Sequence, residues 1–533
     1  MNSFEYNIEA NSEAAGKYIK HLLEMHGMPY PWQIKPQTTK GYDIIRIAIS
    51  KNVKGLRGNQ DRNRYVLISE LYITINEIML KEFGLKPKKE NNITWGYLIP
   101  ANINSSTIPS NSFLIPIRHV RGMGSDARKW MTKYYFSGKT FRLNMFSGKR
   151  LINGVWQGVM SVDLLGFLSS SMLGPLGEVR DLKLYEDWAE VYGNNTSQSI
   201  CNITYVDQII KVIKDMLITL SPEAFPIEIG CFPPGKTAPI IITGDSDDAT
   251  TKQINKYLSV LEKHGIHATI IMKDYKSYRK SFLKNILSRN HSFGIHPYSK
   301  TGTVDEYISN FKHLSYCHKK IFDIGIAGVR NHRFQWLGQT TAIELGKDAK
   351  VFFDLNCVAA SGHTWLGTGS GVGIPIAFPP QKNVFHSYPM QLPTIFEDDV
   401  FLFEHDYCYK PFKDGDKLAL STVIDFLNEW IVIKNLPAVV NLHPEHVNTD
   451  VGVFLNKIAQ WASVSKIWSP TLFEYYNWIR KKNRACIEIR FEEKKIYINN
   501  PVSVIIRVNN VQLGEKNHEY VAKKNTILDF MVS

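Results

Sequence analysis

The chain has 533 residues, which is too long for one ordinary hydrophobic core, so we expect two or three domains. Hydrophobic residues make up 44% and charged residues 21% of the sequence, a composition typical of soluble globular proteins. The net charge of +13, from 63 basic and 50 acidic residues, fits either a solvated basic surface or an anionic partner, such as an acidic or lipid-linked saccharide. No helix-turn-helix, zinc-finger or RNP pattern accompanies this charge, so we do not expect a nucleic-acid partner.

The compartment is predicted from what the sequence lacks. No basic and apolar leader opens it, and no run of about 18 apolar residues could form a spanning helix. The 6 cysteines are scattered without CxxC spacing, as in a reducing compartment. We therefore expect a cytoplasmic protein that can still associate with a membrane surface, and the sequence does not predict its oligomeric state.

Residues 1–225 are predicted to form an N-terminal α/β accessory domain. Apolar spacing predicts a helix over Glu13–Met25 and a strand over residues 41–50. Further helices are expected over residues 163–188 and 205–220. This region has no nucleotide-binding fingerprint, and we assign it no chemistry.

The most informative segment follows a proline- and glycine-rich linker. An apolar run over residues 238–242 predicts a buried strand that stops at Gly244, directly before Asp245, Asp247 and Asp248. Three carboxylates this close repel one another unless a cation or a shared proton neutralises them. The alternative is a solvated acidic turn that caps the helix starting near Thr250. The carboxyl end of a strand is where α/β sheets place ligands and catalytic groups.

The same arrangement recurs four times before residue 483. Predicted strands end in ligand or acid–base side chains at His296, Arg330, Asp354 and His443. Helical patterns separate these strands, which favours a parallel sheet. We therefore predict that residues 226–483 form an α/β barrel whose strand ends converge on one metal-centred pocket.

These five segments resemble the motifs of the NodB-type polysaccharide deacetylases, which are metal-dependent carbohydrate esterases with a distorted (β/α) barrel. The motifs, in order, are residues 243–247, His296-Pro297, residues 328–330, Asp354 and residues 442–444. The resemblance covers about residues 236–480. It implies hydrolysis of N-acetyl groups on the amino sugars of a poly- or oligosaccharide, in surface-polysaccharide or glycolipid synthesis.

The resemblance also implies a role for each residue. Asp245 would be the general base toward the attacking water, and His443 the general acid toward the leaving amine. Asp247 and His296 would bind a divalent cation, with zinc the best match for mixed carboxylate and imidazole ligands. Arg330 would hold the base ionised.

One departure from the family concerns the third ligand. The second motif usually carries another histidine about four residues after the first, but this chain has Lys300, whose ammonium cannot ligate a metal. His332, two residues after the third motif's arginine, is the first candidate for the replacement. His291 is the second, although it and His296 should point to opposite faces of a strand.

Two acids leave alternatives open. If the family's Asp-Asp form is the better alignment, Asp247 and Asp248 would be base and ligand in place of Asp245 and Asp247. Asp354 belongs to the catalytic set by resemblance, but it could equally cap a turn.

Two further segments and two further functions complete the prediction. The glycine-rich residues 364–376, with Trp365, could form a sugar subsite or a plain surface loop, and alternating apolar residues predict a small antiparallel β region over residues 484–533.

An inactive barrel that binds saccharide or supports assembly is one alternative to the deacetylase. An amidohydrolase that acts on another small amide is the other.

Overall fold

A computed structural model provides the structure of the chain. It describes residues 4–10, 13–28, 204, 206–207, 210, 227–356, 372–380, 384–398, 416–490, 495–499, 502–508, 518–523 and 526–529, together with the backbone of the strands named below between residues 34 and 160.

A nine-stranded sheet forms the centre of the described chain. Its order is β18 (Ile376–Ala377), β19 (Met390–Gln391), β17 (Val351–Asp354), β16 (Ile326–Val329), β15 (Ser292–Ile295), β14 (Ala268–Met272), β13 (Ile240–Asp245), β21 (Ala438–Asn441) and β20 (Thr394–Glu397). Every pairing is parallel except that of β18 with β19. Because parallel strands end at the same edge, this order brings the predicted strand-end residues together.

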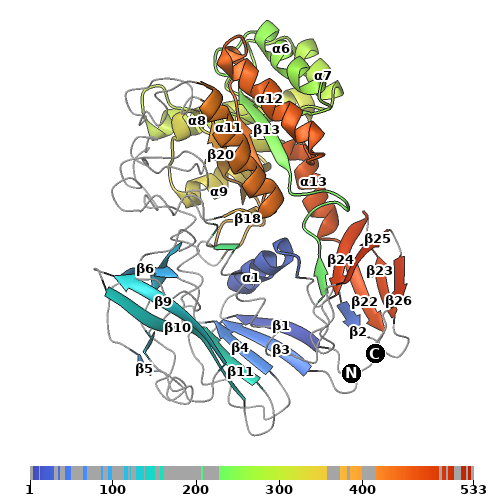
Figure 1. Ribbon diagram of the computed structural model, residues 1–533. Coiled ribbons are helices and arrows are strands. Elements are labelled where there is room, and N and C mark those ends of the chain that lie inside the picture. Colours follow the sequence, from blue (N-terminus) through green and yellow to red (C-terminus); the bar gives the residue numbers. More distant parts are fainter. Residues whose placement is uncertain are drawn as a thin grey trace.

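The strands of this sheet are apolar because both faces are covered. All six residues of β13 are buried, as are all those of β14, β15, β16 and β21. The helices of this region are α6 (Thr251–Glu262), α7 (Lys280–Ser288), α8 (Val304–Phe322), η3 (His332–Phe334), α9 (Gln339–Asp348), α11 (Asp416–Asn428), η4 (Glu429–Ile433), η5 (Pro444–His446), α12 (Asp450–Val464) and α13 (Leu472–Lys482). Figure 1 shows them around the parallel sheet in the upper part of the view.

Helix α6 does not use the preceding acids as its cap. The N-cap is Thr250, whose hydroxyl accepts from the backbone N–H of Gln253, while the Gln253 side chain accepts from the backbone N–H of Thr250. This reciprocal pair satisfies the first turn of the helix. A helix cap therefore does not explain the three aspartates.

The N-terminal region contains a second sheet of six described strands. Its order is β1 (Phe4–Ala10), β3 (Asp43–Ile49), β4 (Arg64–Ile68), β11 (Trp156–Met160), β10 (Lys139–Arg150) and β9 (Arg128–Phe136). Two short pairs join β5 (Lys86–Pro87) to β8 (Val120–Arg121) and β6 (Thr94–Leu98) to β7 (Phe113–Ile117). Helix α1 (Glu13–Met25) has the predicted bounds, and β3 lies within the predicted strand. The expected helix over residues 163–188, most of that over 205–220, and most of the glycine-rich loop 364–376 lie outside the described residues.

Two small sheets contain the predicted C-terminal strands. One has the order β2 (Ile34–Pro36), β22 (Cys486–Arg490), β23 (Lys495–Asn499) and β26 (Thr526–Asp529), and the other β12 (Ile227–Ile229), β24 (Val504–Val508) and β25 (His518–Ala522). The strands of residues 484–533 pair antiparallel, as expected, but each sheet also takes a strand from an earlier part of the chain.

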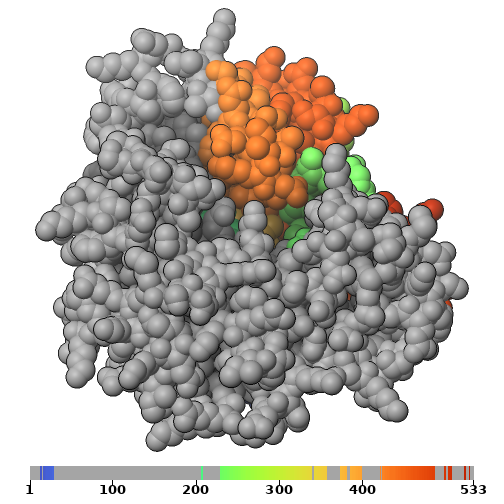
Figure 2. All heavy atoms as spheres, turned by 60° about the horizontal axis from the view of Figure 1, so that its bottom comes forward, coloured from blue at the N-terminus to red at the C-terminus, as the bar shows by residue number. Residues whose placement is uncertain are grey.

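Helix α1 lies between the parallel sheet and the six-stranded sheet (Figure 1), and the His21 imidazole accepts from the backbone N–H of Ala377 in β18. Seen from below, residues of η4 and α12 lie at the surface of the region that contains the parallel sheet (Figure 2). There Val432, Ile433 and Val453 are exposed, while Trp430 and Phe454 are buried. No described helix is both long enough and apolar enough to cross a membrane.

Candidate metal and acid–base site

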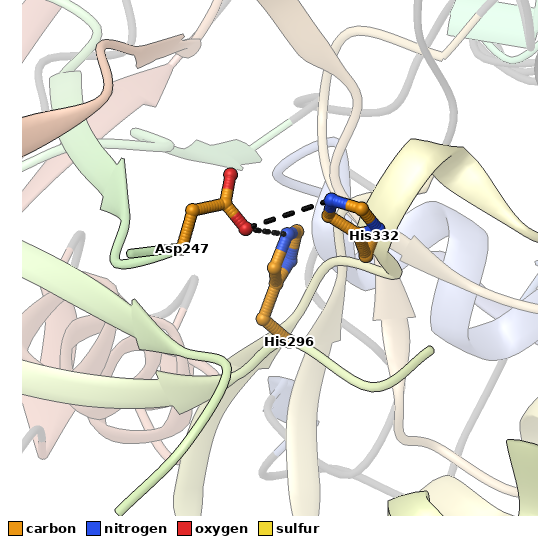
Figure 3. A group of neighbouring side chains, drawn as sticks. All are labelled: Asp247, His296 and His332. Carbon is orange, nitrogen blue, oxygen red and sulfur yellow. Dashed lines mark ion pairs between the residues drawn. The ribbon is translucent and has the colours of Figure 1, made fainter. Parts of the chain in front are cut away.

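Three side chains meet at the carboxyl edge of the parallel sheet: Asp247 from the turn after β13, His296 directly after β15, and His332 shortly after β16 (Figure 3). The Asp247 Oδ1 atom lies 3.5 Å from His296 Nε2 and 3.6 Å from His332 Nε2. We call these residues the Asp247 group. The structure thus brings together both implied ligands and the first candidate for the third.

The hydrogen bond on the far side of His296 determines which of its nitrogens faces Asp247 with a lone pair. His296 Nδ1 lies 2.7 Å from the carbonyl oxygen of Arg330, and since a carbonyl only accepts, Nδ1 must carry the proton. In the neutral form of the ring, Nε2 then presents a lone pair to a carboxylate oxygen, which is also an acceptor. Two facing acceptors repel unless a cation or a proton lies between them.

A divalent cation fits this arrangement. Asp247 Oδ1 is buried and accepts no hydrogen bond within the described part of the chain. Zinc binds carboxylate oxygen and imidazole nitrogen at about 2.0–2.2 Å in tetrahedral geometry, which separates two ligand atoms by about 3.3 Å. The distances to the two histidines are close to this value. A carbonyl acceptor that orients the other nitrogen of a ligating histidine is also a common feature of metal sites.

His332 and Asp247 both have the protonation state that a metal ligand needs. Burial and the neighbouring His296 lower the pKa of His332 to about 4, so its ring is neutral at physiological pH. Burial alone would raise the pKa of Asp247, but its contacts with the His296 and His443 rings bring it well below the usual range. Asp247 is therefore ionised.

The backbone at Asp247 is strained. Its φ angle of 27° lies in the left-handed region, which a residue with a side chain adopts at a cost of about 1–3 kcal/mol. The turn also needs Gly244, because a Cβ there would lie only 3.0 Å from Pro444 Cγ. The close approach of these two loops brings Asp247 next to His443.

The second set of strand-end residues surrounds Asp245. Arg330 Nη1 donates to Asp245 Oδ1 at 2.8 Å, and Asn441 Nδ2 donates to Asp245 Oδ2 at 3.1 Å. Arg330 is itself held by the hydroxyls of Thr243 and Thr394. Asp245 therefore has a buried guanidinium as its counter-ion and is the carboxylate that Arg330 contacts, as the motif alignment with Asp245 and Asp247 requires.

His443 lies between two carboxylates. Its Nδ1 donates to Asp398 Oδ1 at 2.6 Å, and its Nε2 lies 3.3 Å from Asp247 Oδ2. The backbone N–H of His443 donates to the other Asp398 oxygen at 2.8 Å. Burial lowers the pKa of His443, but the charges of Asp398 and Glu397 and the hydrogen bonds to Asp247 and Asp398 raise it well above its ordinary value. The ring is therefore protonated near neutral pH.

Glu397 completes this buried set. Both of its carboxyl oxygens accept from Asn441 Nδ2, at 2.9 and 2.7 Å, and Oε1 lies 3.4 Å from His443 Nδ1. Burial and the carboxylates of Asp398 and Asp245 raise the pKa of Glu397 well above its usual range, although the charge of His443 lowers it. Asp245, Glu397 and His443, the second candidate ligand cluster of the described chain, are called the Asp245 group below.

Glu397 and Asp398 were not predicted from the sequence. Glu397 is the last residue of β20 and Asp398 follows it, so both lie at a strand end, as the five predicted residues do. Residues 394–398 carry the same signal, an apolar run that ends in acidic side chains.

Three singled-out residues lie outside both groups. The Asp248 side chain is 93% exposed, and the backbone N–H of Asp248 donates to Glu445. Lys300 is exposed, on a loop that hydrogen bonds from Ser299 and Thr301 to Glu306 hold in place. His291 accepts from the backbone N–H of Ala268 at 3.0 Å, and its other nitrogen lies 3.0 Å from Glu262. The partners of His291 are structural, as expected for a side chain on the opposite face from His296.

Asp354 is buried at the end of β17, but its described hydrogen bonds go elsewhere. Its Oδ1 accepts from the backbone and side-chain N–H groups of Asn356, and it lines a small cavity with Tyr307 and Trp336. Burial raises the pKa of Asp354 to about 6, although the Asn356 hydrogen bonds lower it. The structure thus gives His443 a different acidic partner, Asp398.

Comparisons with known proteins find likenesses among solved structures. No protein-family model and no curated protein matches the sequence. A solved structure from Mycobacterium smegmatis, assigned as a polysaccharide deacetylase, matches 47% of this chain and 92% of its own, with 16% identity and a TM-score of 0.36. The peptidoglycan deacetylase PdaC of Bacillus subtilis matches 47% and 95%, with 14% identity and a TM-score of 0.28. BA3943, a CE4 family pseudoenzyme from Bacillus anthracis, matches 46% and 66%, with 14% identity and a TM-score of 0.28.

The matched proteins come from the deacetylase family that the five sequence motifs resemble, whose active members hydrolyse amide bonds. Their identities and TM-scores are too low to transfer an activity or a residue's role to this chain.

Proposed function

We propose that this protein is a metal-dependent hydrolase that removes N-acetyl groups from the amino sugars of a poly- or oligosaccharide. One observation carries the proposal: Asp247 Oδ1 lies 3.5 Å from His296 Nε2 and 3.6 Å from His332 Nε2, beside the buried Asp245 and His443 side chains. A cation site adjacent to an acid–base pair is what hydrolysis of an unactivated amide requires.

Asp247, His296 and His332 would hold the cation, and zinc suits this mixture of ligands. When bound, it would polarise the acetamido carbonyl and make a water molecule more acidic. Three protein ligands leave a position open for substrate, as in catalytic zinc sites.

The chain's own residues move the protons. Asp245, which accepts a hydrogen bond from the Arg330 guanidinium, accepts a proton from the water that attacks the acetyl carbon. Protonated His443 donates a proton to the nitrogen of the leaving amine, so that the C–N bond breaks and acetate and the free amino sugar are released. Asp398 fixes the ring of His443 and stabilises its charged form. Glu397 holds the Asn441 amide that donates to Asp245.

Lys300 supports the inactive-barrel alternative only if the second-motif position must supply a ligand. Because Lys300 is on an exposed loop and His332 lies at the cation position, nothing in the site favours that alternative. The same groups would serve hydrolysis of another small amide, so the substrate must be tested directly.

The proposal extends to the surroundings of the site. The parallel sheet is inferred to close into a distorted barrel over residues 226–483, between an accessory domain at 1–225 and the β region at 484–533. The net charge of +13 supports an anionic or lipid-linked saccharide as substrate, taken in the cytoplasm or at a membrane surface.

The first experiment is elemental analysis of the purified full chain, together with acetate release from an N-acetylglucosamine oligomer. We expect about one zinc or similar cation per chain in the wild type, loss of it in His296→Ala, and acetate release only by the metal-containing protein. A wild type that binds no cation after zinc supplementation would refute the proposal. Bound zinc without acetate release from any acetylated sugar would point to another small amide.

A further inference from the structure

Lys273 lies against the Asp247 group, although the proposed chemistry gives it no role. It follows β14 directly, and its backbone N–H donates to Ser246 Oγ at 3.0 Å. Its Nζ lies 3.3 Å from Asp247 Oδ1 and 3.9 Å from Asp248 Oδ1. The ammonium is also 5.4 Å from the centre of the Tyr298 ring, and the side chain is 17% exposed.

The ammonium approaches the same oxygen that His296 and His332 face. All three nitrogens lie 3.3–3.6 Å from Asp247 Oδ1, so Lys273 is at the edge of the space where a cation would bind. A lysine ammonium only donates and cannot join the ligand set while charged. At about 4 Å, like charges repel strongly in a partly buried site. Lys273 and a divalent cation therefore compete for Asp247.

Asp248 offers a second anion within reach. It is in the same turn as Asp247, its backbone N–H is fixed by Glu445, and its carboxylate already lies at ion-pair distance from Lys273. A small rotation of the lysine side chain would transfer the ammonium from Asp247 to Asp248. This would give a purpose to the third acid of the sequence, which neither candidate ligand group contains.

We propose that Lys273 is a displaceable internal counter-cation: it neutralises Asp247 when the cation site is empty and moves to Asp248 when a divalent cation binds. The inference rests on the proposed function only in taking the Asp247 group as the cation site. Its consequence is a weakened, exchangeable site. Lys273 lowers the affinity for the cation, and Asp248 restores part of that affinity by accepting the displaced ammonium.

A double-mutant cycle on zinc affinity tests this directly. Zinc Kd would be measured by competition with a chromogenic chelator for the full-length wild type, Lys273→Met, Asp248→Asn and the double variant. Met keeps the length and apolar stem of the lysine without its charge. We expect Lys273→Met to bind zinc about tenfold tighter or more, because the competing charge is gone.

The Asp248→Asn substitution distinguishes competition by Lys273 from a general effect of charge on zinc affinity. We expect Asp248→Asn to weaken zinc binding in the wild-type background, because the displaced ammonium loses its partner, and to change nothing in the Lys273→Met background. Lys276→Met is the matched control: it removes an exposed lysine three residues along and should leave Kd unchanged.

The outcomes are distinguishable from failure of the proposed function. Weaker or unchanged zinc binding by Lys273→Met would overturn the inference, since it would make Lys273 a support for the ligand or a bystander. An equal effect of Asp248→Asn in both backgrounds would also overturn it, because that is plain long-range attraction. If neither the wild type nor Lys273→Met binds zinc, the proposed cation site itself is refuted, and the inference with it.

Discussion

The Asp247 group and the Asp245 group contain the same kinds of side chain but differ in what neutralises them. In the Asp247 group a carboxylate oxygen faces the Nε2 atoms of two histidines, and the nearest positive charge is the Lys273 ammonium, 3.3 Å away at the edge of the group. In the Asp245 group the guanidinium of Arg330 and the amide of Asn441 already satisfy the carboxylate. The contrast teaches that the hydrogen-bond donors and cations around an acidic cluster indicate better than its residue types whether it binds a metal or transfers protons.

The pKa values of the histidines in the two groups are shifted in opposite directions. His332 of the Asp247 group is kept neutral, with a pKa lowered to about 4, whereas His443 of the Asp245 group has its pKa raised well above the ordinary value. Burial is the main cause at His332, whereas at His443 the contacts with Asp398, Asp247 and Glu397 outweigh the effect of burial. A neutral histidine can ligate, and a protonated one can donate to a leaving group.

The largest effect is expected from Asp245→Asn, which removes the base but no residue of the Asp247 group. We expect kcat/KM for acetate release to fall by about 10²–10⁴-fold, because the amide cannot accept the proton from water. Zinc content should stay at the wild-type level. Unchanged turnover would show that another residue is the base, and lost zinc would mean that the two groups are one site.

The next largest effect concerns the third ligand. We expect His332→Ala to raise the zinc Kd by about a hundredfold, because the substituted site keeps only two of its three ligands. His291→Ala is the matched control, since this histidine bonds to Ala268 and Glu262 and should affect stability but not metal affinity. The reverse result would restore His291 as the ligand.

The smallest effect is a shift in the pH dependence of kcat. Asp398→Asn removes a charge that raises the pKa of His443, and the reaction needs His443 protonated. The alkaline limb of the profile should therefore move to lower pH by about 1–3 units, with about a tenfold loss of rate at neutral pH.

Asp354→Asn is the comparison for this measurement. Asp354 bonds to Asn356 and makes no described contact with His443, so the alkaline limb should stay in place. A shift in Asp354→Asn but not in Asp398→Asn would show that Asp354, which the motif resemblance places in the catalytic set, is the acid that tunes His443.

Local patterns predicted the parts of the site that depend on a single strand. Asp245, Asp247, His296, Arg330 and His443 each follow an apolar run directly, and the structure brings all five together. The bounds of α1 were likewise predictable, since an amphipathic helix is encoded by its own spacing. The parallel pairing of β13 with β14 and β21 then decides which side chains become neighbours.

Pairings between distant strands were not predictable in the same way. Asp398 meets His443 because β20 pairs with β21, 44 residues away at the contact of Glu397 with Asn441, and no local pattern states that pairing. The place of His332 depends on the loop after β16 passing close to β15, where the backbone N–H of His332 donates to Pro297. The sequence alone therefore left the third ligand and the partner of His443 open.

Arg330 connects the two groups through one residue. Its side chain serves Asp245, and its carbonyl oxygen fixes the tautomer of His296. A displacement of the Arg330 backbone by a few tenths of an ångström would disturb two contacts together: the one between the guanidinium and Asp245, and the one between the carbonyl oxygen and the His296 ring. Arg330 at the end of β16 therefore positions both the cation ligand His296 and the base Asp245. A substitution that moves this residue, in evolution or in engineering, would change both parts of the site together.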